Sequence, residues 1–446
     1  MLAQDLATVF SEEHLHHNVN VFNAPLPSQW LEQALSLSDN VTLRRRKLPP
    51  EQVLRLVVGM SLLRQESIQE VATRLAFNSA GLNNDLLVAR SSLSNARQRL
   101  GFEPVKELFE LSARHWNKQT HVDDNWHGLQ VLSIDGTTLR TEDTQELREH
   151  FGSVLNQSDA KSGYPVMQLT CLMNVRNHLI LRAQASEYNE SELSHAAKLQ
   201  ASVPDNSILL MDKLYHSAKL LIGIENQGHR RFWVTPVRKD LKYTMKQKYA
   251  ANDAYVERDL SSARRKDKSL PKHWHMRLIT FKIGRNKEVK IATNLPYEDY
   301  QAKDIINLYK ERWEIELGYR EVKVSMLQNA LTLRSKKKDL VYQELFGMLI
   351  AYNLVRYEIA LTAVEAGVRP TRISFTAALR IVLYDYHIIA TTNSLHTIPA
   401  RMKDITHVLK DFILPKEKRR SNPREKKIDV MRKYSTKKAE HTRKDA

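Results

Sequence analysis

Cysteine is nearly absent from this chain of 446 residues, which contains only Cys171. A single thiol excludes an internal disulfide framework and any zinc site built on several cysteines. Cys171 lies in an apolar stretch, and we interpret it as a buried thiol rather than a nucleophile. The sequence also has no internal repeat, which excludes the repeat architectures.

Uninterrupted hydrophobic runs are missing as well. Residues 1–17 contain acids and histidines and lack the apolar core of a signal peptide. The most apolar later segment, 345–363, carries Asn353, Arg356 and Glu358, so we expect a buried helix rather than a membrane span. These features predict a cytoplasmic protein without a membrane partner.

Acidic side chains are outnumbered by basic ones. The chain has 68 lysines and arginines against 51 aspartates and glutamates, a formal net charge of +17. Such an excess favours a polyanionic partner, because each neutralised phosphate releases counterions and strengthens binding. An anionic membrane is the competing partner, but no basic amphipathic anchor is visible in the sequence.

Changes in residue pattern along the chain predict three regions. Residues 1–118 are predicted to form a helical N-terminal domain, and residues 119–365 an α/β core. Within that core, residues 238–292 are a predicted β-rich insertion with many lysines and arginines. Residues 366–446 make up a C-terminal region whose basic tail, from residue 416, is predicted to be disordered.

Two aspartates directly follow apolar strands of the predicted core. Strand 130–134 ends at Asp135, and strand 207–211 ends at Asp212. Because strands alternate with helices here, we expect a mixed α/β sheet, in which ligands and catalytic groups gather at the carboxyl ends of strands. Either aspartate alone is weak evidence, since aspartate at a strand end commonly forms a turn.

A third candidate acid lies on the next predicted helix. Four polar residues there fall within an arc of roughly 60° on an α-helix that turns ~100° per residue: Tyr309, Arg312, Glu316 and Lys323. A second stripe at helical spacing predicts the packing face: Leu308, Ile315, Tyr319, Val322 and Met326. We therefore expect a polar ridge with one carboxylate among phosphate-seeking groups, although a solvated face with ion pairs is the alternative.

These residues resemble a known family. The Y-(2)-R-(3)-E-(6)-K signature of insertion sequence 4 type transposases is matched by Tyr309, Arg312, Glu316 and Lys323. Together, Asp135, Asp212 and Glu316 resemble the DDE triad of an RNase H-like transposase core. The resemblance covers most of the chain, and the order of strand-end aspartates, long insertion and helical glutamate agrees with it.

The resemblance implies a DNA transposase that binds the terminal inverted repeats of an insertion sequence, cleaves the DNA ends and joins the 3′ ends to target DNA. Asp135, Asp212 and Glu316 would hold two Mg²⁺ ions, with Mn²⁺ as a substitute, for phosphodiester hydrolysis. A homodimer in the synaptic complex and a bacterial, nucleoid-associated location in the cytoplasm are further implications.

The resemblance also implies DNA contacts along the ridge. Arg312 and Tyr309 would hold phosphates near the cut, and Lys323 would grip the strand terminus. Three further candidates come from the residues alone. Arg97 and Arg99, on a helix predicted at 91–101, would lie along DNA, with a surface helix as the equal alternative. Trp274, within the basic insertion, would stack on an unpaired base, with core packing as the alternative.

One departure from the family pattern bears on activity. Relatives commonly have glycine two residues after the second aspartate, followed by tyrosine, whereas this chain has Leu214 before Tyr215. Leu214 would be strained if its backbone needed a positive φ. This departure favours one alternative function, a catalytically inactive DNA-binding protein derived from a transposase. A second alternative on the same core is a metal-dependent nuclease that does not join ends.

Overall fold

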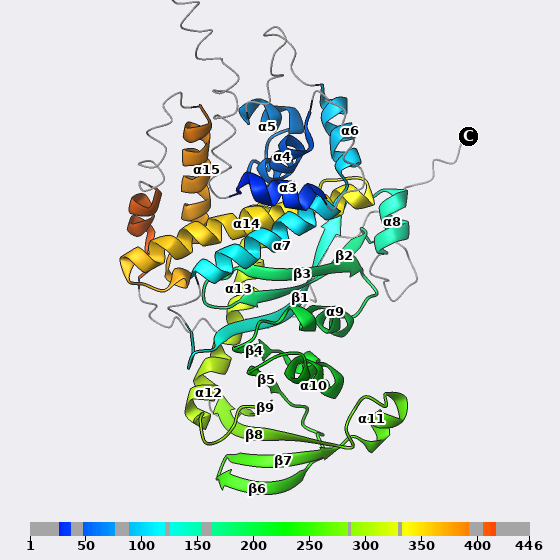
Figure 1. The fold of residues 1–446 in the computed structure, drawn as a ribbon, viewed down its shortest axis with the longest axis vertical. Helices are drawn as coiled ribbons and strands as arrows, with labels where there is room; N and C mark the ends of the chain where they lie inside the picture. The colour runs from blue at the N-terminus through cyan, green and yellow to red at the C-terminus, as the bar shows by residue number, and fades with distance from the viewer. Residues whose placement is uncertain are drawn as a thin grey trace, which may run out of the picture. The chain divides into compact units, whose positions relative to one another are not determined.

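A computed structural model describes residues 26–36, 48–75, 89–120, 125–152, 163–283, 287–328, 332–391 and 405–415 (Figure 1). The predicted tail from residue 416 lies outside these ranges. The chain divides into two compact units. The sheet unit comprises His121–Thr137 and Gln168–Tyr319, and the helical unit comprises Met1–Thr120, Thr138–Met167 and Arg320–Ala446. The predicted domain boundaries at residues 118 and 365 stay predictions.

The strands of the described residues form one ten-stranded mixed sheet in the order β3-β2-β1-β4-β5-β9-β8-β7-β6, with β10 beside β1. Strands β1, β4 and β5 run parallel, and β9 pairs with β5 in the antiparallel sense. The predicted α/β fold with an RNase H-like mixed sheet is therefore confirmed. The strand bounds are β1 Gln130–Thr141, β2 Val166–Asn174, β3 Ile180–Glu187, β4 Ser207–Met211, β5 Arg231–Pro236, β6 Thr244–Ala250, β7 Asp253–Asp259, β8 His273–Ile283, β9 Lys287–Thr293 and β10 Thr332–Leu333.

Apolar runs place the central strands in the core. Every residue of β2 and β4 is buried, as expected for strands covered on both faces. The helix α12 (Ala302–Tyr309) packs Ile305 and Leu308 into the same core cluster as Ile208 of β4 and Ile291 of β9. The helices α9 (Glu192–Leu199) and α10 (Ala218–Asn226) contact β3 and β5, respectively.

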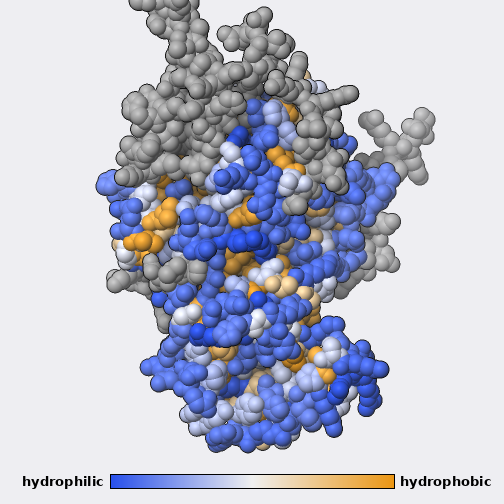
Figure 2. Space-filling model, in the orientation of Figure 1, coloured by the Kyte–Doolittle hydropathy of each residue, from blue (hydrophilic) through white to orange (hydrophobic). Residues whose placement is uncertain are grey.

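The predicted β-rich insertion is confirmed, and the structure shows where it belongs. Strands β6 to β9 form an antiparallel series, and β9 joins β5 through the pair Val234 and Thr293, so the insertion extends the central sheet (Figure 1). Its outermost strand, β6, is almost entirely exposed. Figure 2 shows mainly hydrophilic side chains over these strands.

The helical unit is built around one long buried helix, α14 (Lys338–Ala366), which contains the predicted segment 345–363. It packs against α4, α7 and α15. Gly347 permits the approach of α4, because a Cβ there would lie 2.6 Å from a methyl group of Val57. No helix in the described ranges is both long and apolar enough to cross a membrane. The other helix bounds are α3 Ser28–Ser36, α4 Pro50–Leu62, α5 Ile68–Arg74, α6 Arg90–Leu100, α7 Glu103–Thr120, α8 Gln145–Phe151 and α15 Phe375–Thr391.

The predicted continuous α-helix from Tyr309 to Lys323 is wrong. After α12, the chain forms a 3₁₀ turn at Lys310–Trp313, then α13 (Glu314–Arg320), then a π-helix at Glu321–Met326. These segments turn by different angles per residue, so a single 60° arc does not describe the ridge. The apolar stripe, by contrast, is confirmed, because all five of its residues are buried: Leu308, Ile315, Tyr319, Val322 and Met326.

The π-helix has an identifiable support within the helical unit. The amide of Leu327 donates to the carbonyl of Val322, five residues earlier, at 2.9 Å, which is the hydrogen-bond spacing of a π-helix. The carboxylate of Glu321 pairs with the buried Arg356 of α14 and accepts a hydrogen bond from the hydroxyl of Tyr352 at 2.9 Å. Tertiary contacts from α14 thus accompany a geometry that local helix propensity does not favour.

Candidate active site

The two candidate aspartates come from adjacent parallel strands. Asp212 directly follows β4, as predicted, but the predicted strand end at Asp135 is wrong, because β1 continues through Asp135 to Thr141. In the register of β1 and β4, Ile134 pairs with Met211, and Asp135 and Asp212 are the next residues. Because neighbouring strands lie about 4.8 Å apart, the backbones of the two aspartates are neighbours. Sheet register therefore brings together two residues that are far apart in the sequence.

Arg312 connects the third candidate acid to these aspartates. Its Nη2 donates to Oε1 of Glu316 at 3.2 Å. Burial by itself would lower the pKa of Arg312, but Tyr309 and the carboxylates of Asp212, Glu316 and Asp135 raise that pKa above its ordinary value. All three acids, which we name the acidic triad, therefore lie within electrostatic reach of one guanidinium.

Asp135 is a partly buried member of the acidic triad whose surroundings disfavour its ionised form. Burial raises the pKa of Asp135 to about 6; the amide of Gly136 and the guanidinium of Arg312 oppose this rise, and the carboxylates of Glu192 and Glu316 add to it. A buried carboxylate among other carboxylates is stabilised by a cation or a proton. This position therefore favours a cation partner when it is ionised.

Glu192 is a fourth carboxylate that the sequence did not reveal. It accepts hydrogen bonds from Nε2 of Gln168 and from the hydroxyl of Tyr215, both at 3.1 Å. Its side chain lies so close to Gly136 that a Cβ there would be 2.2 Å from Cδ of Glu192. The glycine after Asp135 signals a close approach, but nothing in the sequence identifies the approaching side chain.

Tyr319 fixes α13 to the strand that carries the first aspartate. Its hydroxyl donates to the carbonyl of Asp135 at 2.6 Å and accepts from the amide of Cys171 at 3.1 Å. Cys171 is fully buried, and burial raises the pKa of its thiol to about 12. The predicted burial of the Cys171 thiol is therefore confirmed, and Tyr319 links α13 with β1 and β2.

The donor set of the acidic triad fits Mg²⁺ in kind, because that ion prefers oxygen ligands. The raised pKa of Asp135 is a second observation that agrees with a cation there. Within the described part of the chain, however, no three His, Cys, Asp or Glu side chains are grouped so that they could hold a metal ion. Metal binding by Asp135, Asp212 and Glu316 therefore stays a prediction.

The other signature residues divide between the two units. Tyr309 and Arg312 belong to the sheet unit with the acidic triad, and burial raises the pKa of Tyr309 to about 12. Nε of Arg312 is buried and has no hydrogen-bond partner among the described residues, so it could donate to a phosphate oxygen. Lys323 lies half-buried on the π-helix of the helical unit.

Two predicted DNA contacts are corrected by burial. Arg97 is only 6% exposed, and its Nε donates to Oε1 of Gln343 at 2.7 Å. Trp274 is 4% exposed, with its ring centre 5.7 Å from that of Trp233. Both side chains are committed to the protein interior, because one completes a hydrogen-bond network and the other an aromatic cluster. Arg99 is exposed, so its DNA contact stays a prediction.

Comparing Arg97 with Arg99 tests this correction on one helix. We expect Arg97→Met to destabilise the protein by about 1–3 kcal/mol, because Gln343 loses its buried charged donor. Arg99→Met should change stability by less than about 0.5 kcal/mol and should lower the salt dependence of DNA binding by about one ion. Urea unfolding and DNA titration would measure both; a stable Arg97→Met protein with selectively weakened DNA binding would restore the original prediction.

Leu214 does not carry the strain that the family pattern suggested. It lies in a 3₁₀ turn, Lys213–Tyr215, and is not among the non-glycine residues with positive φ. Its side chain is 47% exposed. The tyrosine that follows, Tyr215, is buried and donates to Glu192. The substitution of the usual glycine therefore leaves this turn in an ordinary conformation.

Comparison with known proteins adds to this geometry. Residues 126–354 match the transposase DDE domain family, and residues 16–110 match the family described as insertion element 4 transposase N-terminal. Among solved structures, the cryo-EM structure of the piggyBac transposase synaptic complex with hairpin DNA matches with a TM-score of 0.43 and 10% identity, over 90% of this chain and 86% of that chain.

Two curated relatives come from Escherichia coli strain K12. The transposase InsG for insertion sequence element IS4 is 34% identical over 428 residues, which span 95% of this chain and 95% of that protein. The putative transposase InsZ is 39% identical over 228 residues, or 51% of this chain and 75% of that protein. On the strength of the near full-length relative and the two domain matches, the chain belongs to the insertion sequence 4 family of transposases.

Proposed function

We propose that this protein binds the terminal inverted repeats of its own insertion sequence, cleaves the DNA ends and joins the freed 3′ ends to target DNA. The observation that carries the proposal is the arrangement of the three acids: β-sheet register makes Asp135 and Asp212 neighbours, and Glu316 accepts a hydrogen bond from Arg312, whose pKa all three carboxylates raise. Three carboxylates around one phosphate-seeking group suit a phosphodiester substrate and its metal ions.

The residues of the site have separable roles in this proposal. The buried Nε of Arg312 lacks an acceptor within the described residues, and a DNA phosphate oxygen would supply one. Asp135, Asp212 and Glu316 would hold two Mg²⁺ ions, which when bound supply water activation and charge neutralisation at the leaving oxygen. Tyr319, through the carbonyl of Asp135, would keep α13 and β1 in a fixed relation.

The chemistry consists of two displacements at phosphorus. In cleavage, a water oxygen bonds to phosphorus, the bond to the 3′ oxygen breaks, and that oxygen takes up a proton to give a 3′-hydroxyl. In joining, the 3′-hydroxyl loses its proton and bonds to a target phosphorus, and the target strand's own 3′ oxygen leaves. Because joining requires two ends at one target, we infer a homodimer on DNA.

A cleavage and joining assay tests this function. The purified chain would be incubated with a duplex that carries the repeat flanking its coding region, with a scrambled repeat as the control. We expect Mg²⁺-dependent cleavage at the repeat, loss of cleavage on chelation, and recovery with Mn²⁺, because the donor set is carboxylate oxygen. A pre-cleaved end should be joined to a target plasmid.

Two outcomes would contradict the proposal in different ways. Cleavage of the repeat without joining of the pre-cleaved end would indicate a metal-dependent nuclease. Binding of the repeat without either reaction, at any divalent metal, would indicate an inactive DNA-binding protein.

A further inference from the structure

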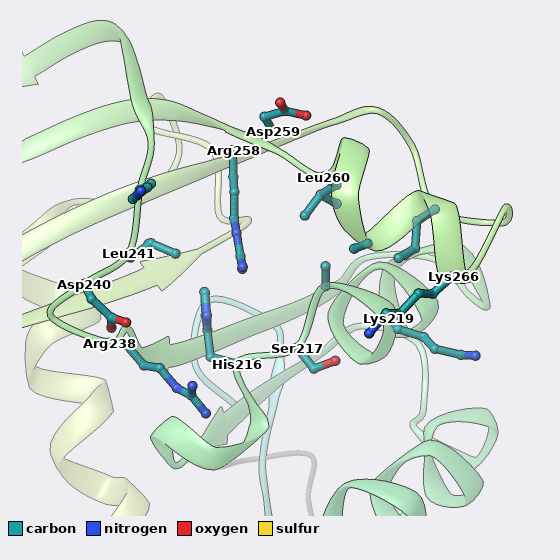
Figure 3. Close-up of a pocket in the computed structure, with 14 residues that line it drawn as sticks. His216, Ser217, Lys219, Arg238, Asp240, Leu241, Arg258, Asp259, Leu260 and Lys266 are labelled. Atoms are coloured by element: carbon teal, nitrogen blue, oxygen red, sulfur yellow. The ribbon is translucent and has the colours of Figure 1, made fainter.

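A cavity of about 700 Å³ in the sheet unit is lined by none of the acidic triad. The turn after β4, the loop after β5, the end of β7 and the helix α11 (Ser261–Lys266) contribute its walls (Figure 3). Only Asp240 and Asp259 among its lining residues are acidic, whereas five are basic: Lys219, Arg238, Lys242, Arg258 and Lys266. The lining therefore favours an anionic ligand.

The positive charge of this cavity is only partly neutralised by the protein. Nζ of Lys219 pairs with Asp267 at 2.8 Å. Asp259 accepts hydrogen bonds of 2.7 and 2.5 Å from the first residue of α11, rather than from a cation. Within the described ranges, neither Arg238 nor Arg258 forms an ion pair. Two guanidinium groups are thus available to a ligand.

A buried imidazole nitrogen belongs to the same group of side chains. Figure 3 shows Arg258 and His216 pointing toward one another across the cavity. Nε2 of His216 is buried and has no hydrogen-bond partner among the described residues. Burial, followed by the charges of Arg258 and Arg238, lowers the pKa of His216 to about 4, so the ring is neutral near pH 7. In the tautomer with hydrogen on Nε2, it can donate to a ligand.

We propose that this cavity, which we name the Arg258 pocket, binds a phosphate group held by Arg258 and Arg238 and hydrogen-bonded to Nε2 of His216. A phosphate has several acceptor oxygens in a geometry that the guanidinium fork matches. A phosphate would accept a hydrogen bond from Nε2 of His216 and offset the charge of Arg238 and Arg258, which form no ion pair among the described residues. Leu241, Leu260 and Leu270 also line the pocket, so an apolar part of a larger ligand would contact these side chains.

The phosphate group has two possible sources with the same chemistry. One is the backbone of DNA, and this source rests on the proposed function. The other is a free phosphorylated molecule such as a nucleotide, which needs no DNA and no catalysis. Pyrophosphate is a suitable probe because it carries the shared chemistry and lacks a base. A failed pyrophosphate titration is therefore distinguishable from a failed cleavage assay.

The test compares Arg258→Met with Arg264→Met in the full chain. Arg264 is exposed on α11 and does not line the pocket, so its replacement removes the same charge from the neighbouring surface. By calorimetric titration, wild type should bind pyrophosphate saturably, and Arg258→Met should weaken binding about tenfold or more through loss of the bidentate contact. Arg264→Met should change it less than about twofold.

A competition experiment identifies the source of the phosphate group, and a second variant keeps the test valid if the first does not fold. If DNA supplies the phosphate, pyrophosphate should compete with the repeat duplex, and Arg258→Met should reduce the salt slope of DNA binding by about one ion. Pyrophosphate binding without competition would assign the pocket to a free phosphorylated molecule. Should Arg258→Met fail to fold, Arg258→Lys removes the fork and keeps the charge, with weaker binding again expected. Absence of saturable binding by wild type, or equal losses in Arg258→Met and Arg264→Met, would overturn the proposal.

Discussion

Replacing Glu316 with glutamine is expected to lower the rate of DNA cleavage by about a thousandfold or more, the scale seen when one member of a cooperating catalytic set is removed. The amide oxygen of glutamine can still accept from Nη2 of Arg312, as Glu316 does at 3.2 Å. The substitution therefore preserves the local geometry and removes one negative charge. That charge is the property that a divalent metal would need.

Glu314 provides the matched control for this experiment. It lies two residues earlier on α13, and its carboxylate pairs with His178 at 2.9 Å instead of with Arg312. Glu314→Gln removes the same charge from the same helix and should change the cleavage rate less than about threefold, as expected for a partly exposed pair. Single-turnover cleavage of the repeat duplex, with circular dichroism as the folding check, would measure both variants.

The outcome separates the possible roles of the α13 acids. Equal losses of cleavage rate in the two variants would mean that the negative charge of α13 matters for stability or for DNA binding in general, and not for the reaction itself. Full activity of Glu316→Gln would remove Glu316 from the acidic triad and contradict the proposed mechanism. A loss confined to Glu316→Gln, with unchanged DNA binding, is the expected result.

Replacing Arg277 with methionine is expected to weaken the insertion strands by about 3–5 kcal/mol, the cost of leaving a buried charge without its partner. Arg277 of β8 donates to both carboxylate oxygens of Asp253 in β7, at 2.9 and 2.6 Å. The two side chains are only 3% and 2% exposed. The same guanidinium donates to the carbonyl of Tyr300 at 2.8 Å, so several buried groups lose their donor together.

Hydrogen exchange is the appropriate measurement, because a chain of two compact units need not unfold in one transition. Amide exchange in β7 and β8 should accelerate by about two to nearly four orders of magnitude, the factor that 3–5 kcal/mol produces. The double variant Arg277→Met/Asp253→Ala should recover part of the protection, since it removes the stranded carboxylate.

An exposed ion pair on the same strands serves as the control. Lys246 of β6 pairs with Glu257 of β7 at 3.0 Å and is 44% exposed. Lys246→Met should lower the free energy of the opening that permits amide exchange by no more than about 1 kcal/mol, as for other surface pairs. Similar effects of Arg277→Met and Lys246→Met would show that burial of the Arg277 pair contributes little to the stability of these strands.

Local sequence patterns predicted the elements of this fold well. The strand end before Asp212, the helix α6 near residues 91–101 and the buried helix α14 all follow from residue periodicity and turn chemistry. The predicted strand end before Asp135 does not, because β1 continues to Thr141. Such patterns act over a few residues, so they can be read without a tertiary structure. The break of the signature helix into 3₁₀, α and π segments was not predictable in this way.

The candidate site shows the same division. Spacing and resemblance selected the acidic triad, but they missed Glu192, because its approach to Asp135 depends on how α9 packs against the sheet. They also misplaced Arg97 and Trp274 on a DNA-facing surface. A basic or aromatic residue has the same one-letter code whether it faces solvent or fills the interior, and only packing distinguishes these cases.

The sequence by itself determined the family, the α/β order of elements and the identity of the three candidate acids, because each of these features depends on residues that are contiguous in the chain. The tertiary structure decided which side chains meet. Parallel register made Asp135 and Asp212 neighbours, and packing placed Arg312 within reach of all three acids. Among the described residues, it also left Arg258 without an acidic partner, pointing toward His216. These relations join segments tens of residues apart, and only the folded chain fixes their distances.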